Sequence, residues 1–182
     1  MDSETSSSNE TFMYFAYGSN LLSRRIHFQN PTAVRRGTGK LKDYRLDFNT
    51  QSRNWNGCSA TIVEHEGRYV WGAVWEIDMA NMADLDRQEG VERNLYKALT
   101  KDVETPNGER ITCRVYQKVT NPEETYELED LPLDRQPSRT YLTCILKGAE
   151  ESQLPVEYID KLKRIPHNNR DANNMTFREL CE

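Results

Sequence analysis

The pattern of apolar and polar residues divides the chain into a body rich in strands, with a few short helices. The apolar, aromatic run at residues 13–17 predicts a first strand, and the helical pattern after it extends to about residue 30, where Pro31 stops it. Residues 44–48 alternate apolar with polar, residues 59–63 are short and β-prone, and residues 68–77 predict a longer strand. This strand carries its large apolar side chains on one face at period two, and we expect Trp71 and Trp75 to be core residues; the face comprises Tyr69, Trp71, Ala73, Trp75 and Ile77.

The second half of the chain predicts two more strands and then two helices. Strands at residues 94–103 and 110–119 flank Pro106-Asn107-Gly108, a favourable hairpin turn. Residues 122–137 are acidic and rich in proline, which indicates a surface loop. One helix is expected from about Ser138 and another from Pro155, the latter with an apolar stripe made of Ile159, Leu162 and Ile165.

These elements predict an α+β fold. The strands are many, the helices are few, and no regular βαβ alternation is present, so we expect a mixed sheet that curls into a small barrel. Residues 1–10 are polar and rich in serine, and we expect a disordered N-terminal tail. We expect residues 11–166 to form a single domain and the Asn-rich residues 167–182 to form a peripheral C-terminal tail.

Length and charge narrow the classes of partner. A chain of 182 residues is one domain by the usual length rule. Its formal charge is −5 and no basic stripe is present, which argues against nucleic acid and anionic membranes as partners. The first residues are polar and acidic, unlike a signal peptide, and no apolar run could span a bilayer, so we expect a cytoplasmic protein.

The cysteines and histidines do not indicate a cofactor. Cys58, Cys113, Cys144 and Cys181 are widely separated without a C-x-x-C motif, which is typical of reduced thiols in a chain without an export signal. No histidine lies near Cys113 or Cys144 in the sequence, so a thiol nucleophile is not expected. The three histidines show no ligand spacing, and we expect neither a metal nor another cofactor; they are His27, His65 and His167.

The first candidate for chemistry is the segment Tyr17-Gly18-Ser19-Asn20-Leu21, where the predicted strand meets the predicted helix. Gly18 permits close approach of a ligand or a positive φ, and Ser19 or Asn20 could cap the helix. Free N–H groups at such a turn suit a carboxylate or an oxyanion. Gly18 is its only glycine, so a diphosphate site is not expected. An ordinary strand-to-helix turn remains the alternative.

The second candidate is Glu89, at the end of a helix that Asp78 is expected to cap and Gly90 to terminate. Met82 and Leu85 lie on one face of this helix, and Glu89 occupies the next position on that apolar stripe. Desolvation and the negative end of the helix dipole should raise the pKa of Glu89, which suits a general base and acid. The alternative is a glutamate exposed on a frayed last turn, or one paired with an arginine. Asp84, Asp86 and Arg87 lie off the stripe and are expected to be solvated charges.

The segment Tyr14-Phe15-Ala16-Tyr17-Gly18-Ser19-Asn20-Leu21, taken together with Gln88-Glu89-Gly90-Val91, resembles the gamma-glutamylcyclotransferase family. Further segments match in order, so that the resemblance covers residues 12–165; they are Arg25-Ile26-His27, Leu46-Asp47-Phe48, Ala60-Thr61-Ile62, Val70-Trp71-Gly72, Ile111-Thr112-Cys113-Arg114 and Leu154-Pro155-Val156-Glu157-Tyr158. The resemblance implies a small barrel with flanking helices, a homodimer, and Glu89 as the catalytic glutamate.

The resemblance also implies a substrate pocket and a reaction in glutathione metabolism. The implied substrate-binding residues are Tyr14, Phe15, Ala16, Tyr17, Gly18, Ser19, Asn20, Tyr96, Tyr116 and Tyr141. The substrate would be a γ-glutamyl amino acid, whose own α-amine attacks its γ-carbonyl to release 5-oxoproline and a free amino acid, with Glu89 as general base and acid. Two alternatives remain: an enzyme specific for γ-glutamylamines or for glutathione, and a non-catalytic interaction module on the same fold.

Overall fold

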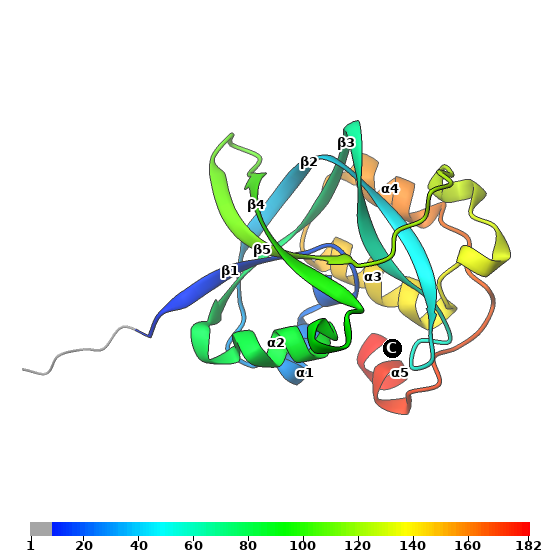
Figure 1. Cartoon of the computed structure of the whole chain (residues 1–182), viewed down its shortest axis with the longest axis horizontal. Coiled ribbons are helices and arrows are strands. Elements are labelled where there is room, and N and C mark those ends of the chain that lie inside the picture. The colour runs from blue at the N-terminus through cyan, green and yellow to red at the C-terminus, as the bar shows by residue number, and fades with distance from the viewer. Residues whose placement is uncertain (1–8) are drawn as a thin grey trace, which may run out of the picture.

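The computed structural model describes residues 9–182, which fold around a closed five-stranded barrel with the strand order β1-β3-β2-β4-β5 (Figure 1). The strands are β1 (Thr11–Ala16), β2 (Val34–Ser52), β3 (Gly57–Asp78), β4 (Tyr96–Glu104) and β5 (Arg110–Lys118). The expected α+β barrel is thereby confirmed. The predicted disordered tail at residues 1–10 falls largely on residues 1–8, which lie outside the described range.

The long hairpin of β2 and β3 forms most of the barrel wall. It pairs continuously from Val34 opposite Glu76 to Ser52 opposite Gly57, so the strands predicted separately at residues 59–63 and 68–77 are one strand. Register shifts at three places, between residues 35 and 37, 42 and 44, and 49 and 51, mark irregularities of the kind that bend a hairpin.

Side chains on both faces of β3 are buried, whereas the period-two pattern predicted a single apolar face. Trp75 is fully buried as expected, but Val70 and Val74 on the opposite face are fully buried too. Trp71 is only partly buried, and Tyr69, at the end of the predicted apolar face, is exposed. The prediction of a core position is therefore confirmed for Trp75, whereas Trp71 only packs against the core.

Two strand contacts close the barrel. β1 runs parallel to β5, with Tyr14 opposite Arg114, and β2 meets β4 where Lys40 lies opposite Glu104. β4 and β5 form the predicted hairpin, and Gly108 takes a φ of +85° in its turn. A glycine is the residue best suited to this conformation.

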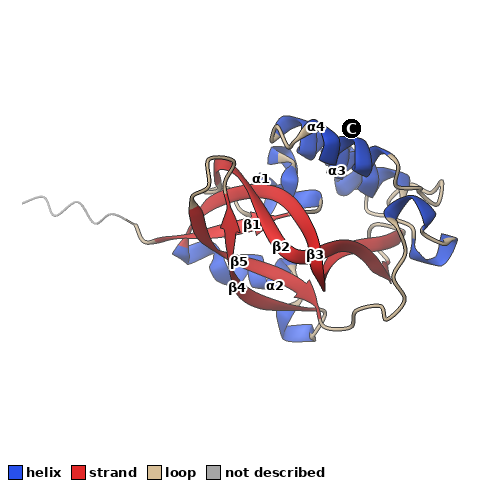
Figure 2. Ribbon diagram, turned by 90° about the horizontal axis from the view of Figure 1, so that it is seen from above, coloured by secondary structure: helices blue, strands red, loops and turns tan. Residues whose placement is uncertain are grey.

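The helices lie outside the barrel; they are α1 (Ser23–Gln29), α2 (Met82–Gln88), α3 (Arg139–Glu151), α4 (Val156–Lys163) and α5 (Met175–Cys181). Figure 2 shows α3 and α4 together, with α2 apart from them near β4 and β5. Ser138 caps α3 by accepting a hydrogen bond from the Tyr141 N–H at 3.2 Å, and Ile159 and Leu162 are buried as predicted. Asp78 instead precedes a short 3-10 turn (Met79–Asn81), and its side chain makes no capping bond, so that prediction was wrong. Within residues 9–182, no helix is both long enough and apolar enough to cross a bilayer.

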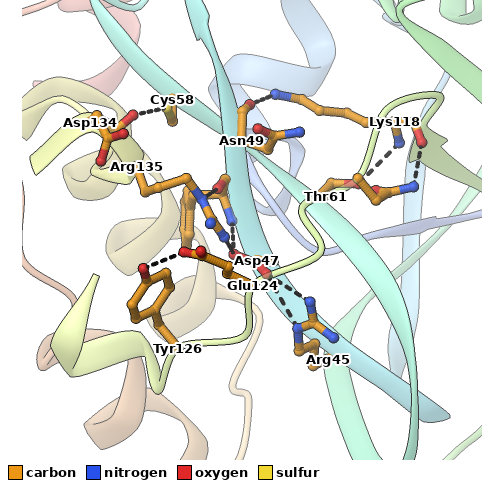
Figure 3. Close-up of polar contacts among 12 residues, drawn as sticks. Arg45, Asp47, Asn49, Cys58, Thr61, Lys118, Glu124, Tyr126, Asp134 and Arg135 are labelled. Atoms are coloured by element: carbon orange, nitrogen blue, oxygen red, sulfur yellow. Dashed lines mark hydrogen bonds and ion pairs between the residues drawn. The ribbon is translucent and has the colours of Figure 1, made fainter. Parts of the chain in front are cut away.

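The acidic segment at residues 122–137 lies largely at the surface but is tied to the barrel. Leu131 is buried, and Arg135 donates to the Asp47 carboxylate at 2.5 Å and to the Phe48 carbonyl at 2.6 Å. Arg45 donates to the other oxygen of Asp47 at 3.2 Å, so two guanidinium groups share this buried carboxylate (Figure 3). Because removing one member of such a network leaves a buried charge unpaired, the segment is held more firmly than its composition indicated.

The C-terminal residues 167–182 are not peripheral, which corrects the prediction. Their helix α5 is capped by Asn174, whose side chain accepts a hydrogen bond from the Phe177 N–H at 3.1 Å. Asn173 donates to the Arg53 carbonyl at 2.7 Å, and the Asn174 N–H donates to the Asn54 carbonyl at 3.1 Å. The asparagines therefore bind the turn between β2 and β3, and Figure 1 shows α5 beside that turn.

Candidate functional site

A cavity of about 740 Å³ opens among α1, the end of α2, α5 and the turn between β2 and β3. All predicted site residues except two line it, namely Tyr14, Tyr17, Gly18, Ser19, Asn20, Glu89, Tyr96, Tyr116 and Tyr141. Phe15 and Ala16 do not line the cavity, because both are fully buried in the core. Successive strand residues face opposite sides of the sheet, so Phe15 points away from Tyr14 and its ring lies against Gly72.

The turn after β1 forms one wall of the cavity. Its first hydrogen bonds run from the Leu21 N–H to the Gly18 carbonyl at 3.1 Å and from the Leu22 N–H to the Ser19 carbonyl at 3.2 Å. Among residues 9–182 no group accepts a hydrogen bond from the N–H groups of Gly18, Ser19 or Asn20. These three donors are therefore free for a ligand.

The structure excludes one of the two expected roles of Gly18 and both expected helix caps. Gly18 has a φ of −116°, so a positive φ is not the reason for glycine here. The reason is space, because a Cβ atom at Gly18 would lie 3.1 Å from the hydroxyl oxygen of Tyr141. Neither Ser19 nor Asn20 caps the helix, since the turn opens a short 3-10 segment (Ser19–Leu21) and α1 begins only after Leu22.

Packing against α3 and β3 fixes the position of the turn. A Cβ atom at Gly148 of α3 would lie 2.5 Å from the Leu21 Cβ and 2.6 Å from the Leu22 nitrogen, so the helix contacts the turn backbone directly. From the other side, the Trp75 indole N–H donates to the Asn20 carbonyl at 3.0 Å. Leu21 itself is fully buried. The turn is therefore preorganised before any ligand arrives.

Asn20 connects the two sequence motifs directly. Its side-chain amide is buried, and the Nδ2 atom donates to the Tyr14 hydroxyl at 3.1 Å. Its Oδ1 atom accepts from Gln88 Nε2 at 3.2 Å, and Gln88 in turn accepts from Asn30 at 2.9 Å. Because Gln88 immediately precedes Glu89, this bond holds the carboxylate at a set position relative to the turn.

Glu89 follows the last residue of α2, and Gly90, with a φ of +66°, ends the helix as predicted. Leu85 on the same stripe is fully buried. The Glu89 carboxylate lines the cavity, and within the described part of the chain it has no ion-pair or hydrogen-bond partner. Burial raises its pKa to about 7, the nearby charges of Arg25 and Lys118 lower it, and Asp86 raises it. The alternative of an arginine-paired glutamate was therefore wrong.

Four tyrosines surround Glu89, and their pKa values are raised by burial and by the negative charge of Glu89; they are Tyr14, Tyr17, Tyr96 and Tyr141. The hydroxyl of Tyr141 accepts from the Ala60 N–H at 2.9 Å, and that of Tyr14 accepts from Asn20. No acceptor for the protons of these two hydroxyls lies among residues 9–182, so both can donate to a ligand.

The other two hydroxyls are committed within the protein. Tyr96 donates to the Ala60 carbonyl at 2.7 Å, and Tyr17 donates to the Tyr116 carbonyl. Their rings still line the cavity. These tyrosines therefore shape the walls, whereas Tyr14 and Tyr141 present donors.

Tyr116 reaches Glu89 indirectly, through an aspartate that was expected to be solvated. Asp86 accepts from the Tyr116 hydroxyl at 2.5 Å and, in a bidentate pair, from Arg114 at 2.8 and 2.9 Å. The prediction that Asp86 is an ordinary surface charge was wrong, because β5 lies against this face of α2. Since Asp86 lies three residues before Glu89, the network ties the Glu89 end of α2 to the barrel.

Sequence reasoning missed several residues of the cavity. Lys118 is buried, and its ammonium donates to the carbonyls of Asn49, of Ser59 at 3.2 Å and of Thr50 at 3.4 Å; Figure 3 shows the contact with Asn49. Burial lowers the pKa of Lys118 to about 8. Nothing in the sequence singles out Lys118, because only the tertiary structure brings it to the cavity. Arg25, in contrast, lies in a segment that supported the resemblance.

The raised pKa of Glu89 predicts a pH-dependent effect of Glu89→Gln on stability. The folded-state pKa of about 7 exceeds the ordinary value of 4.5, so the stability that Glu89 contributes below pH 4.5 is lost as the pH rises through 7. Glutamine does not ionise. We therefore expect Glu89→Gln to be more stable than the wild type at pH 8.5, by about 1–3 kcal/mol, with little difference at pH 4.5.

Urea unfolding of both proteins at the two pH values measures this difference. Glu92→Gln is the matched control, because Glu92 is exposed close to the same helix end. An equal difference between Glu89→Gln and wild type at both pH values would contradict the raised pKa.

The cysteines lie outside the cavity. All four are buried and free of disulfides, which agrees with the expected reduced thiols, and burial raises the pKa of Cys113 to about 12. Within residues 9–182, no group of three or more histidine, cysteine, aspartate or glutamate side chains is arranged to hold a metal ion.

Comparison with known proteins gives a consistent result. The model of the AIG2-like family matches residues 69–162. The curated gamma-glutamylcyclotransferase of Bos taurus is 45% identical over 168 residues, which are 90% of this chain and 84% of the relative. The curated gamma-glutamylcyclotransferase of Homo sapiens is 43% identical over 169 residues, which are 91% of this chain and 84% of the relative. A solved structure described as gamma-glutamyl cyclotransferase superposes with a TM-score of 0.84 at 38% identity, covering 94% of this chain and 98% of that one.

Proposed function

The chain belongs to the gamma-glutamylcyclotransferase family of enzymes, and from this we propose that it converts γ-glutamyl amino acids to 5-oxoproline and a free amino acid. The observation that carries this proposal is Glu89, a carboxylate without a protein partner, beside a turn with three free N–H groups in one cavity. The reaction is an acyl transfer within the substrate, in which the α-amine forms a bond to the γ-carbonyl carbon and the bond to the leaving nitrogen breaks.

Glu89 serves as the general base and then as the general acid. Its pKa of about 7 leaves a substantial fraction ionised at neutral pH, so it can take a proton from the substrate ammonium and return it to the leaving amine. The substrate supplies its own nucleophile, and the cavity has to fold it so that amine and carbonyl meet. Positioning of this kind can lower the activation free energy by several kcal/mol.

The turn at Gly18–Asn20 binds the γ-glutamyl part of the substrate. Its three free N–H groups suit either the α-carboxylate or the γ-carbonyl oxygen, and in the second case they stabilise the oxyanion of the tetrahedral intermediate. The hydroxyls of Tyr14 and Tyr141 supply further donors next to this turn. Several neutral donors around one carboxylate fit a ligand that carries both an ammonium and anionic oxygens.

The test is product formation by the purified protein. We expect 5-oxoproline from γ-glutamyl-alanine, at a rate well above that from glutathione or γ-glutamyl-ε-lysine. Chromatographic quantification of 5-oxoproline after incubation with each compound measures the three rates. Product from γ-glutamyl-ε-lysine alone would instead indicate a γ-glutamylamine enzyme, and no product from any of them would favour the interaction module. We also propose that the protein is a cytoplasmic homodimer with a role in glutathione metabolism. Sedimentation equilibrium would measure its oligomeric state.

A further inference from the structure

The cavity carries a charge opposite to that of the molecule. The chain as a whole has a formal charge of −5. The cavity lining, in contrast, contains five cationic side chains and one carboxylate, that of Glu89; the cations are Arg25, Arg53, Arg87, Arg93 and Lys118. Clustered charge of one sign in a cleft attracts ligands of the opposite sign. The cavity therefore favours a substrate with more than one anionic group.

Arg25 differs from the other arginines of the cavity because it is buried and forms no ion pair within residues 9–182; its charge acts on Glu89 only from beyond 4.0 Å. Its side chain belongs to α1 and is 4% exposed. Nη1 donates to the Gln29 side chain at 3.0 Å, and Nε is buried with no partner. In the part of the chain that the structure describes, no carboxylate lies within 4.0 Å of its guanidinium group. A buried guanidinium is unfavourable unless an anion pairs with it, so its counter-ion is expected from the ligand.

Two aromatic rings orient this guanidinium group. Its central carbon lies 4.5 Å from the Phe177 ring centroid and 5.7 Å from that of Trp55. The two rings stack on each other with centroids 4.5 Å apart, and both line the cavity. Contact with ring faces leaves the edge of a guanidinium group available for hydrogen bonds in its own plane. The group is thus preorganised to receive a planar carboxylate.

The substrate of the proposed reaction has two carboxylates, and the role inferred below for Arg25 rests on the proposed function. One belongs to the γ-glutamyl unit, which Glu89 and the Gly18 turn already serve, and the other belongs to the leaving amino acid. Arg25, Trp55 and Phe177 come from different elements: α1, the turn between β2 and β3, and α5. We propose that Arg25, held by Trp55 and Phe177, binds the carboxylate of the leaving amino acid. The enzyme thereby selects γ-glutamyl amino acids over γ-glutamylamines, which lack this group.

Two ligands that differ only in that carboxylate test the proposal. γ-Glutamyl-alanine and γ-glutamyl-ethylamide have the same carbon skeleton apart from the leaving group's carboxylate. Both are titrated calorimetrically into Glu89→Gln, which binds without turnover, and into Glu89→Gln combined with Arg25→Gln. Arg24→Gln in the same background is the matched control, because Arg24 lies exposed on α1 next to Arg25 and does not line the cavity.

We expect Arg25→Gln to weaken the binding of γ-glutamyl-alanine about 10- to 100-fold, the range for a charge-assisted hydrogen bond. The binding of γ-glutamyl-ethylamide should weaken less than about threefold. Arg25→Lys should restore part of the loss, because it keeps the charge but not the fork geometry. Equal weakening of both ligands would overturn the proposal, since Arg25 would then support the cavity or bind the γ-glutamyl carboxylate. Unchanged binding of both would overturn it as well.

The same protein preparations separate this proposal from the proposed function. If the wild type forms no 5-oxoproline from γ-glutamyl-alanine, the function fails, whatever the titrations give. If it forms 5-oxoproline and the two ligands respond equally to Arg25→Gln, only the assignment of Arg25 fails. In the steady state, the proposal further predicts that Arg25→Gln raises KM for γ-glutamyl-alanine more than it lowers kcat, whereas a purely structural role would reduce turnover of every substrate alike.

Discussion

Replacing Glu89 with glutamine is expected to lower kcat for γ-glutamyl-alanine by about two to four orders of magnitude, while the protein stays folded. Glutamine keeps the length and hydrogen-bonding reach of the side chain but cannot take a proton. The carboxylate has no ion-pair partner among residues 9–182, so the substitution breaks no salt bridge. Measurement of 5-oxoproline release under saturating substrate, with circular dichroism as the check on folding, gives the result.

The pH dependence of wild-type activity provides a second test of Glu89. With a pKa of about 7, a general base loses its active form as the pH falls, so kcat/KM should drop about tenfold per unit below pH 7. The exposed Glu92, three residues further along the chain, provides the control, and Glu92→Gln should retain the wild-type profile. Activity of Glu89→Gln within about threefold of wild type, or a flat wild-type profile down to pH 5, would remove Glu89 from the mechanism.

Substituting Gly18 with valine is expected to reduce kcat/KM by at least about a hundredfold, the range for losing a donor to an oxyanion. A Cβ atom alone would lie 3.1 Å from the Tyr141 hydroxyl and 3.5 Å from the Ala60 Cβ, and the two methyl groups of valine extend further. Either the turn or Tyr141 must move. Both present donors to the cavity, so the loss should appear in binding as well as in turnover.

A graded series separates the turn's geometry from general instability. Gly18→Ala adds only the Cβ atom and should be milder than Gly18→Val. Ser19→Ala should also be mild, because the Ser19 side chain caps no helix. Titration of Gly18→Val in the Glu89→Gln background with γ-glutamyl-alanine tests binding without chemistry. Affinity equal to that of the Glu89→Gln parent would mean that the turn is structural and binds no substrate.

The local pattern of the chain predicted most of the elements. An apolar run was sufficient for β1, and the turn at residues 106–108 for β4 and β5. Pro137 marked the start of α3, and an apolar stripe at helical spacing marked α4. Glycine at position 90 and asparagine-glycine at positions 107 and 108 marked a helix end and a hairpin, since both need a positive φ. The position of Glu89 on an apolar stripe likewise followed from helical spacing, and its raised pKa is consistent with that position.

Contacts between distant segments decided the features of the fold that local patterns did not predict. The parallel pairing of β1 with β5 closes the barrel, and no pattern within either strand specifies its partner. Asp86 lies off the apolar stripe and was expected to be solvated, but β5 supplies Arg114 and Tyr116 to it. The Asn-rich C-terminus lacks an obvious apolar pattern, yet α5 lines the cavity with Phe177 because its asparagines bind the turn between β2 and β3.

For the site, the sequence by itself determined which groups are proposed to carry the chemistry: Glu89 and the turn around Gly18 belong to short motifs whose geometry is local. Only the tertiary structure decided how these motifs meet, through the hydrogen bond from Gln88 to Asn20, and which side chains surround them. Arg25 and Lys118 acquire their properties from burial beside groups far away in the sequence. Desolvation and pairing depend on the three-dimensional surroundings of a residue, and a residue's neighbours in the chain do not specify those surroundings.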